Sequence, residues 1–301
     1  MDGLLVVDKP IGPTSHDVVA RVRRLLGERR IGHAGTLDPA ASGLLPLVVG
    51  RATRLVRFLS AADKRYEAAI RLGLETDTYD AAGRAMGAPY EGPLPSVDAV
   101  AGAIQAFRGS FSQQPPAFSA KKIAGKRSHR LARAHARRGT VPPARPAPVQ
   151  VTVHAIDAVS VEGSLVKLTI ACSAGFYVRS LAHDLGASLG TGAHLEALRR
   201  TAMGDLRLVD ALPLDAAERD PTLALRRLLP MRTLLADLPS GVLTEDGVKR
   251  AAQGRELRPA DFSLRAGQGG FVRLLDEAGE LVGIASPGSI PGTLHPSIVL
   301  M

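Results

Sequence analysis

One loop constrains this chain more than any other segment, because it holds a single carboxylate among small and apolar residues. Residues 35–45 read GTLDPAASGLL, and the segment 30–34 just before them reads RIGHA. The glycines permit backbone conformations and close approaches that side chains resist, and Pro39 biases Asp38 towards an extended backbone. An Asp-Pro pair alone commonly marks a turn. The loop as a whole predicts an exposed acid with room for a ligand beside it.

Length and composition limit the rest of the fold. With 301 residues, the chain is long enough for one large domain and one small one. Apolar residues make up 45% of it, but aromatic residues only 4%, and Trp is absent. The core must therefore consist mainly of Leu, Val, Ile and Ala.

Several classes of protein are disfavoured by what the chain lacks. No run approaches about 18 uncharged apolar residues, the length of a membrane span. The first residues, with Asp2 before a short apolar stretch, do not resemble a secretory signal. The lone Cys172, expected as a buried strand thiol, excludes an internal disulfide and a cysteine-based metal cage. We therefore expect a cytoplasmic protein with no membrane segment and no metal.

The positive charge is concentrated in one stretch. The net charge of the chain is +9. Between Ala99 and Ile156 there are ten Lys or Arg and no Asp or Glu, whereas the rest has 28 basic and 29 acidic residues. A charge run can be no more than a solvated helix face, but ten cations without a compensating carboxylate are typical of phosphate binding. The stretch therefore predicts contact with nucleic acid.

Hydrophobic spacing predicts the order of the main elements. Ser15 is expected to cap the first helix. Helices are expected over 15–27, 53–60, 97–107, 178–189, 221–229 and 245–252. Strands are expected over 4–7, 44–49, 66–72, 149–153, 165–172, 271–275 and 281–285, the last two as a hairpin. The proline-bounded stretch 114–148, with a cationic helix over 128–137, is expected to leave the core.

The loop at Asp38 resembles the nucleophile motif of a family of pseudouridine synthases, the TruB family, which acts on the T-loop of bacterial tRNA. Further motifs of that family follow in its order: GLLVVDKPIGPTSHD at 3–17, KRYEA at 64–68, TDTYD at 76–80, QPPAFSAK at 114–121, CSAGFYVRSL at 172–181 and GAHLEALRR at 192–200. Together they cover roughly residues 1–205, and their shared order is far more specific than any short pattern. One departure is Phe176, where the family commonly has a small hydroxyl residue.

The resemblance implies an α+β fold. It predicts a pseudouridine synthase catalytic domain over 1–237, with a mixed, mainly antiparallel central sheet flanked by helices and loops. A basic RNA-gripping insertion is expected at about 112–148. Residues 238–301 loosely resemble a small PUA-like β domain that binds RNA.

The resemblance also implies the activity. Such an enzyme converts the uridine at position 55 of the tRNA T-loop to pseudouridine, after flipping the base out of the RNA. The reaction is an isomerisation that needs a carboxylate and an enclosed pocket, but no cofactor or metal. The expected partner is the T-arm of tRNA, and a monomer is sufficient.

Three residues are expected to carry the chemistry by this resemblance. Asp38 would be the nucleophile, and Arg179 would keep its carboxylate ionised. Tyr66 would pack against the uracil and handle a proton. Two alternatives stay open from the residues alone: Arg179 could be a surface arginine at a helix start, and Tyr66 a strand tyrosine with its ring in the core.

The remaining site residues are expected to bind substrate. His33 would fill space in the RNA loop by stacking, although a lone histidine is more often structural. Tyr177 and the backbone of Leu198 would contact uracil. Asp80 would orient Arg179 from its far side, unless it belongs to an ordinary Asx turn. The phosphate contacts are assigned to Lys121, Arg130 and Arg133.

Two other functions compete with this reading. A non-catalytic RNA-binding or RNA-remodelling protein could use the same basic stretch and C-terminal domain. The intact set of Asp38, Tyr66 and Arg179 argues against it. An RNA methyltransferase is disfavoured because the sequence shows no cofactor-binding loop.

Overall fold

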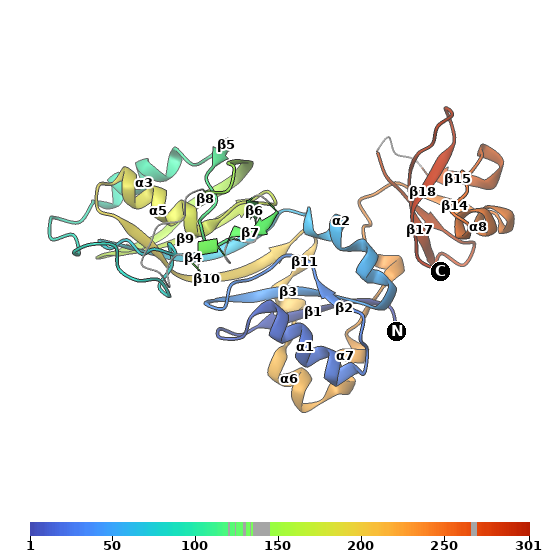
Figure 1. Ribbon diagram of the computed structural model, residues 1–301, viewed down its shortest axis with the longest axis horizontal. Helices are drawn as coiled ribbons and strands as arrows, with labels where there is room; N and C mark the ends of the chain where they lie inside the picture. Colours follow the sequence, from blue (N-terminus) through green and yellow to red (C-terminus); the bar gives the residue numbers. More distant parts are fainter. Residues whose placement is uncertain (120, 124, 129–130, 133, 135–144, 266–269) are drawn as a thin grey trace.

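The computed structural model of the chain describes residues 1–119, 121–123, 125–128, 131–132, 134, 145–265 and 270–301. A long mixed sheet with helices packed on it forms most of the molecule, and a small second sheet lies at the C-terminal end (Figure 1). The predicted α+β class is therefore confirmed, as is the small C-terminal β domain.

The main sheet is mixed and mainly antiparallel, as expected. Its strands follow the order β12-β1-β3-β10-β4-β9-β8-β5, and only the β1–β12 and β3–β10 pairings of the described residues are parallel. The strands are β1 (Gly3–Lys9), β2 (Ile31–His33), β3 (Ala41–Val49), β4 (Lys64–Leu72), β5 (Gly109–Gln113), β8 (Val149–Glu162), β9 (Leu165–Cys172), β10 (Ala193–Met203), β11 (Leu206–Arg207), β12 (Leu212–Pro213) and β13 (Leu229–Pro230).

Helices cover the two ends of this sheet separately. The α-helices are α1 (Ser15–Leu26), α2 (Val56–Ser60), α3 (Val97–Gln105), α5 (Val178–Ser188), α6 (Leu214–Arg219) and α7 (Pro221–Arg226), and short 3₁₀ turns are η1 (Gly50–Leu55), η2 (Leu208–Asp210) and η3 (Met231–Thr233). Helices α1, α6 and α7 pack with β1 and β3, whereas α3 and α5 pack with β4, β8 and β9 (Figure 1). Leu198 on β10 packs against both clusters and so marks their junction. None of the described helices is both long and apolar enough to cross a membrane.

Local sequence explains where α1 begins, and corrects one prediction. Thr14, not Ser15, is the N-cap. Its hydroxyl accepts from the Asp17 amide at 3.1 Å, and the Asp17 carboxylate accepts from the Thr14 amide at 2.9 Å. Ser15 is instead the first helical residue, and its Oγ both donates to and accepts from the Leu37 backbone at 2.9 Å. The start of α1 is thereby tied to the loop at Asp38.

Other boundaries differ from the predictions where packing extends or shortens an element. The helix expected over 53–60 begins as the 3₁₀ turn Gly50–Leu55 and becomes α-helical only over Val56–Ser60. Strand β8 runs to Glu162, because it continues to pair with β9 beyond the predicted end. Helix α7 ends at Arg226 rather than near residue 229, because Leu229 joins β13 beside β1.

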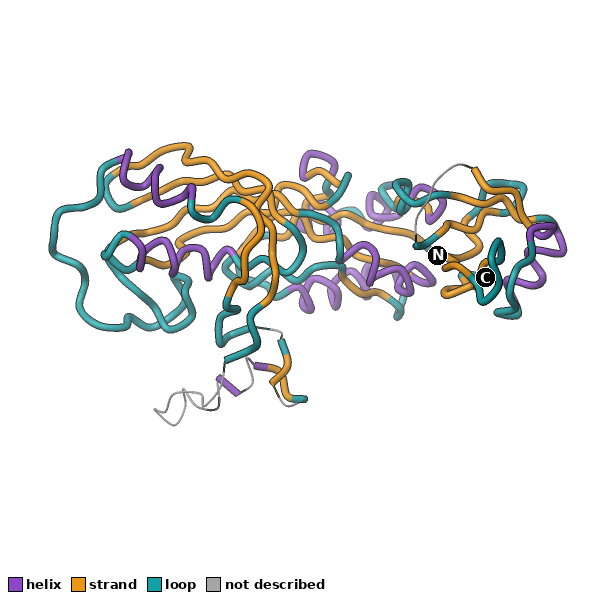
Figure 2. The backbone as a smooth tube through the Cα atoms, turned by 90° about the horizontal axis from the view of Figure 1, so that it is seen from above, coloured by secondary structure: helices purple, strands orange, loops and turns teal. Residues whose placement is uncertain are grey.

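The basic insertion leaves the sheet, as expected. Its described part includes a short hairpin of β6 (Lys122–Ile123) and β7 (Lys126–Arg127), which stands off the main body (Figure 2). Most of the cationic helix predicted over 128–137 lies outside the described residues.

The C-terminal domain is a five-stranded sheet in its described part, with one helix packed on it. Its elements are β14 (Ser240–Leu243), α8 (Glu245–Ala252), η4 (Pro259–Asp261), β15 (Phe262–Arg265), β16 (Val272–Leu275), β17 (Leu281–Pro287) and β18 (Leu294–Val299). The predicted helix over 245–252 and the β16–β17 hairpin are confirmed.

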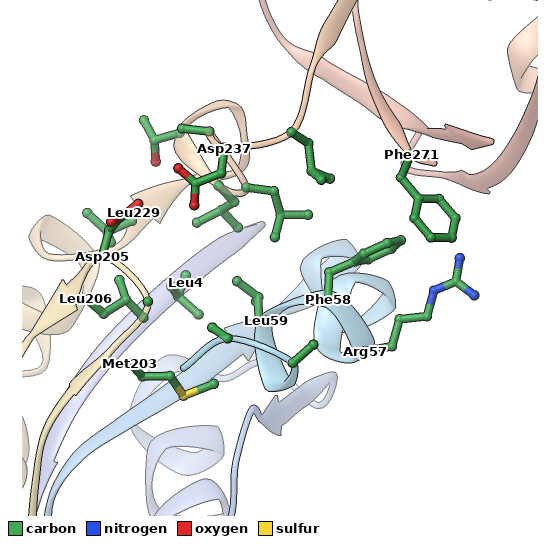
Figure 3. Close-up of a pocket in the computed structure, with 18 residues that line it drawn as sticks. Leu4, Arg57, Phe58, Leu59, Met203, Asp205, Leu206, Leu229, Asp237 and Phe271 are labelled. Carbon is green, nitrogen blue, oxygen red and sulfur yellow. The ribbon is translucent and has the colours of Figure 1, made fainter. Parts of the chain in front are cut away.

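The two domains share one apolar cluster. Leu281 and Ile284 of β17 lie in it together with Leu4 of β1 and Val48 of β3. Beside this contact, an apolar groove of about 600 Å³ lies between α2 and residues 229–238, with Phe271 of the C-terminal domain at its edge (Figure 3). At its mouth the rings of Phe58 and Phe271 meet edge to face, with centroids 4.9 Å apart.

Candidate active site

The loop at Asp38 connects β2 to β3 and is held in place by a buried arginine. Arg200 on β10 is only 1% exposed. Its Nε donates to the Leu44 carbonyl at 2.7 Å and its Nη2 to the Gly35 carbonyl at 2.8 Å. A Cβ at Gly43, whose φ is +100°, would lie 2.3 Å from the Arg200 carbonyl oxygen. The loop sequence therefore needs glycine at this position.

A buried lysine holds the other side of the loop. Lys9 at the end of β1 is fully buried, and its Nζ donates to the carbonyls of Pro10 at 2.8 Å and Ala41 at 2.7 Å. Burial lowers the Lys9 pKa to about 8, and the nearby Asp38 carboxylate opposes this shift. Sequence reasoning named neither Lys9 nor Arg200 as a site residue. Both stand in the quoted motifs, but a motif does not show that a cation is buried.

Arg179 brings the two predicted carboxylates together. Its Nη2 lies 3.0 Å from the Asp38 carboxylate, and its Nη1 lies 3.6 Å from that of Asp80. The guanidinium also donates to the Thr78 and Phe118 carbonyls at 3.2 and 3.0 Å. The Arg179 side chain is 9% exposed, whereas that of Asp38 is 44% exposed. The buried arginine therefore fixes a carboxylate that remains open to a substrate, and the alternative of a surface arginine is wrong.

The first turn of α5, which carries Arg179, is anchored to the end of β5. The side chain of Gln113 accepts from the Tyr177 amide at 2.8 Å and donates to the Tyr177 carbonyl at 3.0 Å. Ser180 donates its hydroxyl to the Gln114 carbonyl at 2.7 Å. These bonds set the direction in which Arg179 leaves the helix.

Asp80 takes part in both of the arrangements considered for it. Its Oδ1 accepts from the Thr78 hydroxyl at 2.6 Å and from the Ala82 amide at 3.1 Å, which is an Asx-type turn. Its Oδ2 faces Arg179. The turn thus uses one carboxylate oxygen and leaves the other for the arginine.

Tyr66 lies on β4 with its ring in the core. It is 9% exposed and belongs to the cluster formed by β4, β8, β9 and α5. Burial raises the Tyr66 pKa, while a hydrogen bond with Arg200 acts in the opposite direction. The phenol is therefore neutral at physiological pH and can hold a proton close to the loop at Asp38.

The other predicted site residues, Leu198, Tyr177 and His33, have different surroundings. Leu198 borders a narrow cleft of about 10 Å³ that is also lined by Asp38, Asp80 and Arg179. Burial raises the pKa of Tyr177, whose hydroxyl bonds with Ser119. Burial lowers the His33 pKa to about 4, so this ring is neutral; it lies edge-on to His16 with centroids 5.2 Å apart.

The predicted phosphate contacts are only partly visible. Lys121 is exposed at the start of the insertion hairpin. Arg130 and Arg133 lie outside the described residues. Among the described residues there is no group of three His, Cys, Asp or Glu side chains placed to hold a metal ion.

Comparison with known proteins gives a single family. Residues 23–178 match the family described as TruB family pseudouridylate synthase (N terminal domain), and residues 179–236 match the tRNA pseudouridylate synthase B C-terminal domain. A tRNA pseudouridine synthase B of Solibacter usitatus is 40% identical over 306 residues, with 100% of both chains covered. That of Gloeobacter violaceus is 43% identical over 304 residues, covering 100% of this chain and 99% of the relative.

Solved structures agree with the sequence comparison. The fold is similar to a chain in an H/ACA RNP bound to a substrate RNA containing 2'-deoxyuridine, with a TM-score of 0.73 and 26% identity. It is also similar to a chain in a Cbf5-Nop10-Gar1 complex, with a TM-score of 0.74 and 27% identity. Each comparison covers 99% of this chain and 85% of the other. The protein, with its aspartate loop held against a buried arginine, belongs to the TruB family of pseudouridine synthases.

Proposed function

We propose that this pseudouridine synthase converts uridine 55 in the T-loop of tRNA to pseudouridine, with Asp38 as nucleophile and without a cofactor. The observation that carries the proposal is the 3.0 Å contact between the Arg179 guanidinium and an Asp38 carboxylate that stays 44% exposed. A carboxylate next to a fixed cation is favoured in its ionised form, the form that acts as a nucleophile. The tRNA substrate is that of the named relatives.

The reaction can be written with all atoms balanced. The bond from ribose C1' to uracil N1 breaks, the base rotates, and a bond from C1' to C5 forms. The proton that leaves C5 is matched by one gained at N1, so the product is an isomer of the substrate. Asp38 adds to the nucleotide and leaves again, either at C1' of the sugar or at C6 of the base.

The target base must leave the RNA stack to reach Asp38. The cleft lined by Asp38 and Leu198 holds only about 10 Å³, far less than a pyrimidine ring occupies. The base therefore enters as the cleft widens, and the RNA completes the wall of the site. In this proposal Tyr177 and the Leu198 backbone contact the uracil. Tyr66, whose ring lies mostly in the core, would meet the base through its remaining 9% of exposed surface. The neutral His33 ring would stack within the RNA loop.

Binding affinity is assigned to the basic insertion. It carries nine of the ten cations within residues 99–156, a stretch with no acid, whereas residues 238–301 hold six basic and seven acidic residues. Phosphate contacts by Lys121, Arg130 and Arg133 would supply the salt-dependent part of binding. The PUA-like domain would contribute contacts that depend on shape rather than on net charge. Nothing in this scheme requires more than a monomer in the cytoplasm.

The test uses purified protein and an unmodified tRNA transcript with no additives. Pseudouridine is mass-silent, so it is detected by chemical labelling that stops reverse transcription at the modified position. We expect product at position 55 and none in a transcript with cytidine at that position. Binding without product would favour the non-catalytic RNA-binding protein, and a mass gain that requires a methyl donor would favour the methyltransferase.

A further inference from the structure

Tyr79 lies between two residues that contact Arg179, and its backbone is unusual. Its φ is +64°, and Leu235 is the only other non-glycine residue with positive φ in the described part of the chain. Bulky L-residues rarely adopt this conformation. The carbonyl of the preceding Thr78 accepts from Arg179, and the carboxylate of the following Asp80 faces it. The backbone at Tyr79 therefore determines both contacts at once.

A ring stack holds Tyr79 against the helix that carries Arg179. The rings of Tyr79 and His183 are parallel, with centroids 4.0 Å apart and an interplanar angle of 8°. His183 follows Arg179 by four residues on α5, so the two side chains leave the same face of the helix. Helix α5 thus contacts the 78–80 turn at two points, through the Arg179 guanidinium and through the His183 imidazole.

The same turn is bonded on its other side to β10. The Leu195 amide donates to the Tyr79 carbonyl at 2.9 Å, and the Ala81 amide donates to the Leu195 carbonyl at 2.9 Å. Leu195 and Leu198 line the cleft at Asp38. The turn is therefore clamped between the helix that supplies Arg179 and the strand that borders the cleft.

We propose that Tyr79 and His183 are positioning residues for the reaction. Their stack holds the left-handed turn in place, the turn holds the Thr78 carbonyl and the Asp80 carboxylate on Arg179, and Arg179 then presents Nη2 to Asp38. The stack does not touch the substrate in this scheme. The inference rests on the proposed role of Asp38 as the nucleophile.

The experiment measures the single-turnover rate at saturating T-arm RNA, together with RNA affinity and melting temperature. His183→Ala and Tyr79→Gly remove one ring each, and glycine also tolerates the positive φ. We expect each to slow the chemical step on the order of 10- to 100-fold, as misplaced catalytic groups do, with RNA affinity changed by less than about threefold. His183→Phe and Tyr79→Phe keep a ring for stacking and should recover most of the lost rate.

Two controls separate positioning from general destabilisation. Leu235→Gly makes the same replacement at the other positive-φ residue of the described chain, which lines the apolar groove beside α2, and should leave the rate unchanged. A double-mutant cycle combines His183→Ala with Asp80→Asn. If the stack acts through Asp80, the double variant should be no slower than the slower single variant within about threefold, because coupled residues are not additive.

Specific outcomes would overturn the inference. It is wrong if Tyr79→Gly keeps the wild-type rate, if the Phe variants are as slow as the truncated ones, or if the two losses in the cycle multiply. Failure of the proposed function looks different, since the wild-type protein would then form no pseudouridine at position 55. The variants can in that case be compared on any RNA that the wild-type enzyme does modify.

Discussion

The cleft at Asp38 and the apolar groove beside α2 differ in size and in chemistry. The cleft holds about 10 Å³, and its lining includes three acidic residues, Asp38, Asp80 and Glu196, and the arginine Arg179. The groove holds about 600 Å³ and is lined mainly by leucines, alanines and two phenylalanines (Figure 3). The groove also has Arg57, Asp205 and Asp237 in its lining, but in the cleft Arg179 contacts both Asp38 and Asp80. Converging charges, and not volume, therefore support the catalytic centre that we propose at Asp38.

The difference follows from what fills each hollow. In the proposed mechanism an extruded base brings its own sugar and phosphates, so the enzyme would supply only part of the wall around Asp38. The groove instead lies beside the domain contact, and of its described lining residues only Leu238 and Phe271 belong to residues 238–301. Arg57 covers its mouth, with its guanidinium carbon 4.7 Å from the Phe58 ring and 5.5 Å from that of Phe271. We therefore expect changes at the cleft to alter rate, and changes at the domain contact to alter stability.

The largest expected effect is the loss of turnover in Asp38→Asn. The substitution keeps the volume of the side chain and removes the nucleophile and its charge, so single-turnover pseudouridine formation should disappear. RNA affinity should survive, because phosphate contacts made elsewhere supply most of it. The measurement pairs a single-turnover rate with a separate binding isotherm. Near-normal turnover would contradict the role assigned to this loop.

Arg179 should come next. Arg179→Ala strands the Asp38 and Asp80 carboxylates without their shared cation, and we expect a rate loss on the order of 100- to 1,000-fold, in the range found for lost electrostatic stabilisation. Arg179→Lys should restore only part, because a point charge cannot span two carboxylates as a guanidinium fork does. Single-turnover rates rank the variants, and full activity in Arg179→Lys would show that the fork geometry is unimportant.

The sequence predicted well the elements whose signals are local. Helix α8 runs over Glu245–Ala252, as predicted. Its first turn is capped by Thr244, whose side chain accepts from the Gly247 amide. Strand β9 runs over Leu165–Cys172 as predicted, because inward and outward residues alternate along it. The loop at Asp38 was singled out from its own residues and from the order of motifs between residues 3 and 200, and its role as nucleophile stays a prediction. For α8 and β9 the information lies within about ten neighbouring residues.

The sequence failed where distant partners decide the structure. Strand β10 lies in the middle of the main sheet. It contains the charged residues Glu196, Arg199 and Arg200, which are more typical of a surface segment. Glu196 pairs with Arg71 at 2.9 Å and Arg199 with Asp8 at 2.7 Å. These partners are far away in the chain, and no local pattern reveals them. For the same reason, the sequence did not indicate that Lys9 and Arg200 are buried.

The domain contact should respond in stability and not in rate. Ile284 is fully buried in the cluster shared by the two domains, so Ile284→Ala should lower the free energy of unfolding by about 2–5 kcal/mol. The single-turnover rate of the folded protein should stay within about twofold. Ile290→Ala is the matched control, because Ile290 lies in the same domain and is 63% exposed. Equal destabilisation by both variants would show that burial in the shared cluster contributes nothing extra to stability.

The basic insertion is a third region to test, and its described part lines neither hollow. Replacing Arg130, Arg133 and Arg137 with Gln should weaken tRNA binding and lower the salt slope by about 2–3 units, given a slope of about −0.7 to −0.9 per phosphate contact. The measurement is the logarithm of affinity against that of salt concentration. The matched control replaces Arg219, Arg226 and Arg227 near α6 and α7. An unchanged slope in the insertion variant would mean that its arginines are solvated surface.

The smallest expected effect concerns Lys64, which lies between the two hollows. It is 7% exposed, and its Nζ donates to the carbonyls of Ser60 at 2.7 Å and Ala62 at 2.6 Å. Ala62 lines the apolar groove beside α2, whereas Arg200, whose charge also disfavours the Lys64 cation, donates to the Gly35 carbonyl in the loop at Asp38. Burial lowers the Lys64 pKa from 10.5 to about 8.

The sign of the resulting pH dependence follows from linkage. Below pH 8 both states hold the proton, but between about pH 8 and 10.5 the unfolded chain keeps a proton that the native state has released. The unfolded state then binds more protons, so this group makes stability rise with pH in that window. Lys64→Met should remove up to one proton from the slope of unfolding free energy between pH 8 and 10. Lys9 has a similar shift but is present in both proteins, so the difference isolates Lys64. Parallel urea-midpoint curves for the two proteins would mean that Lys64 keeps its proton in the folded state, stabilised by the carbonyls it contacts.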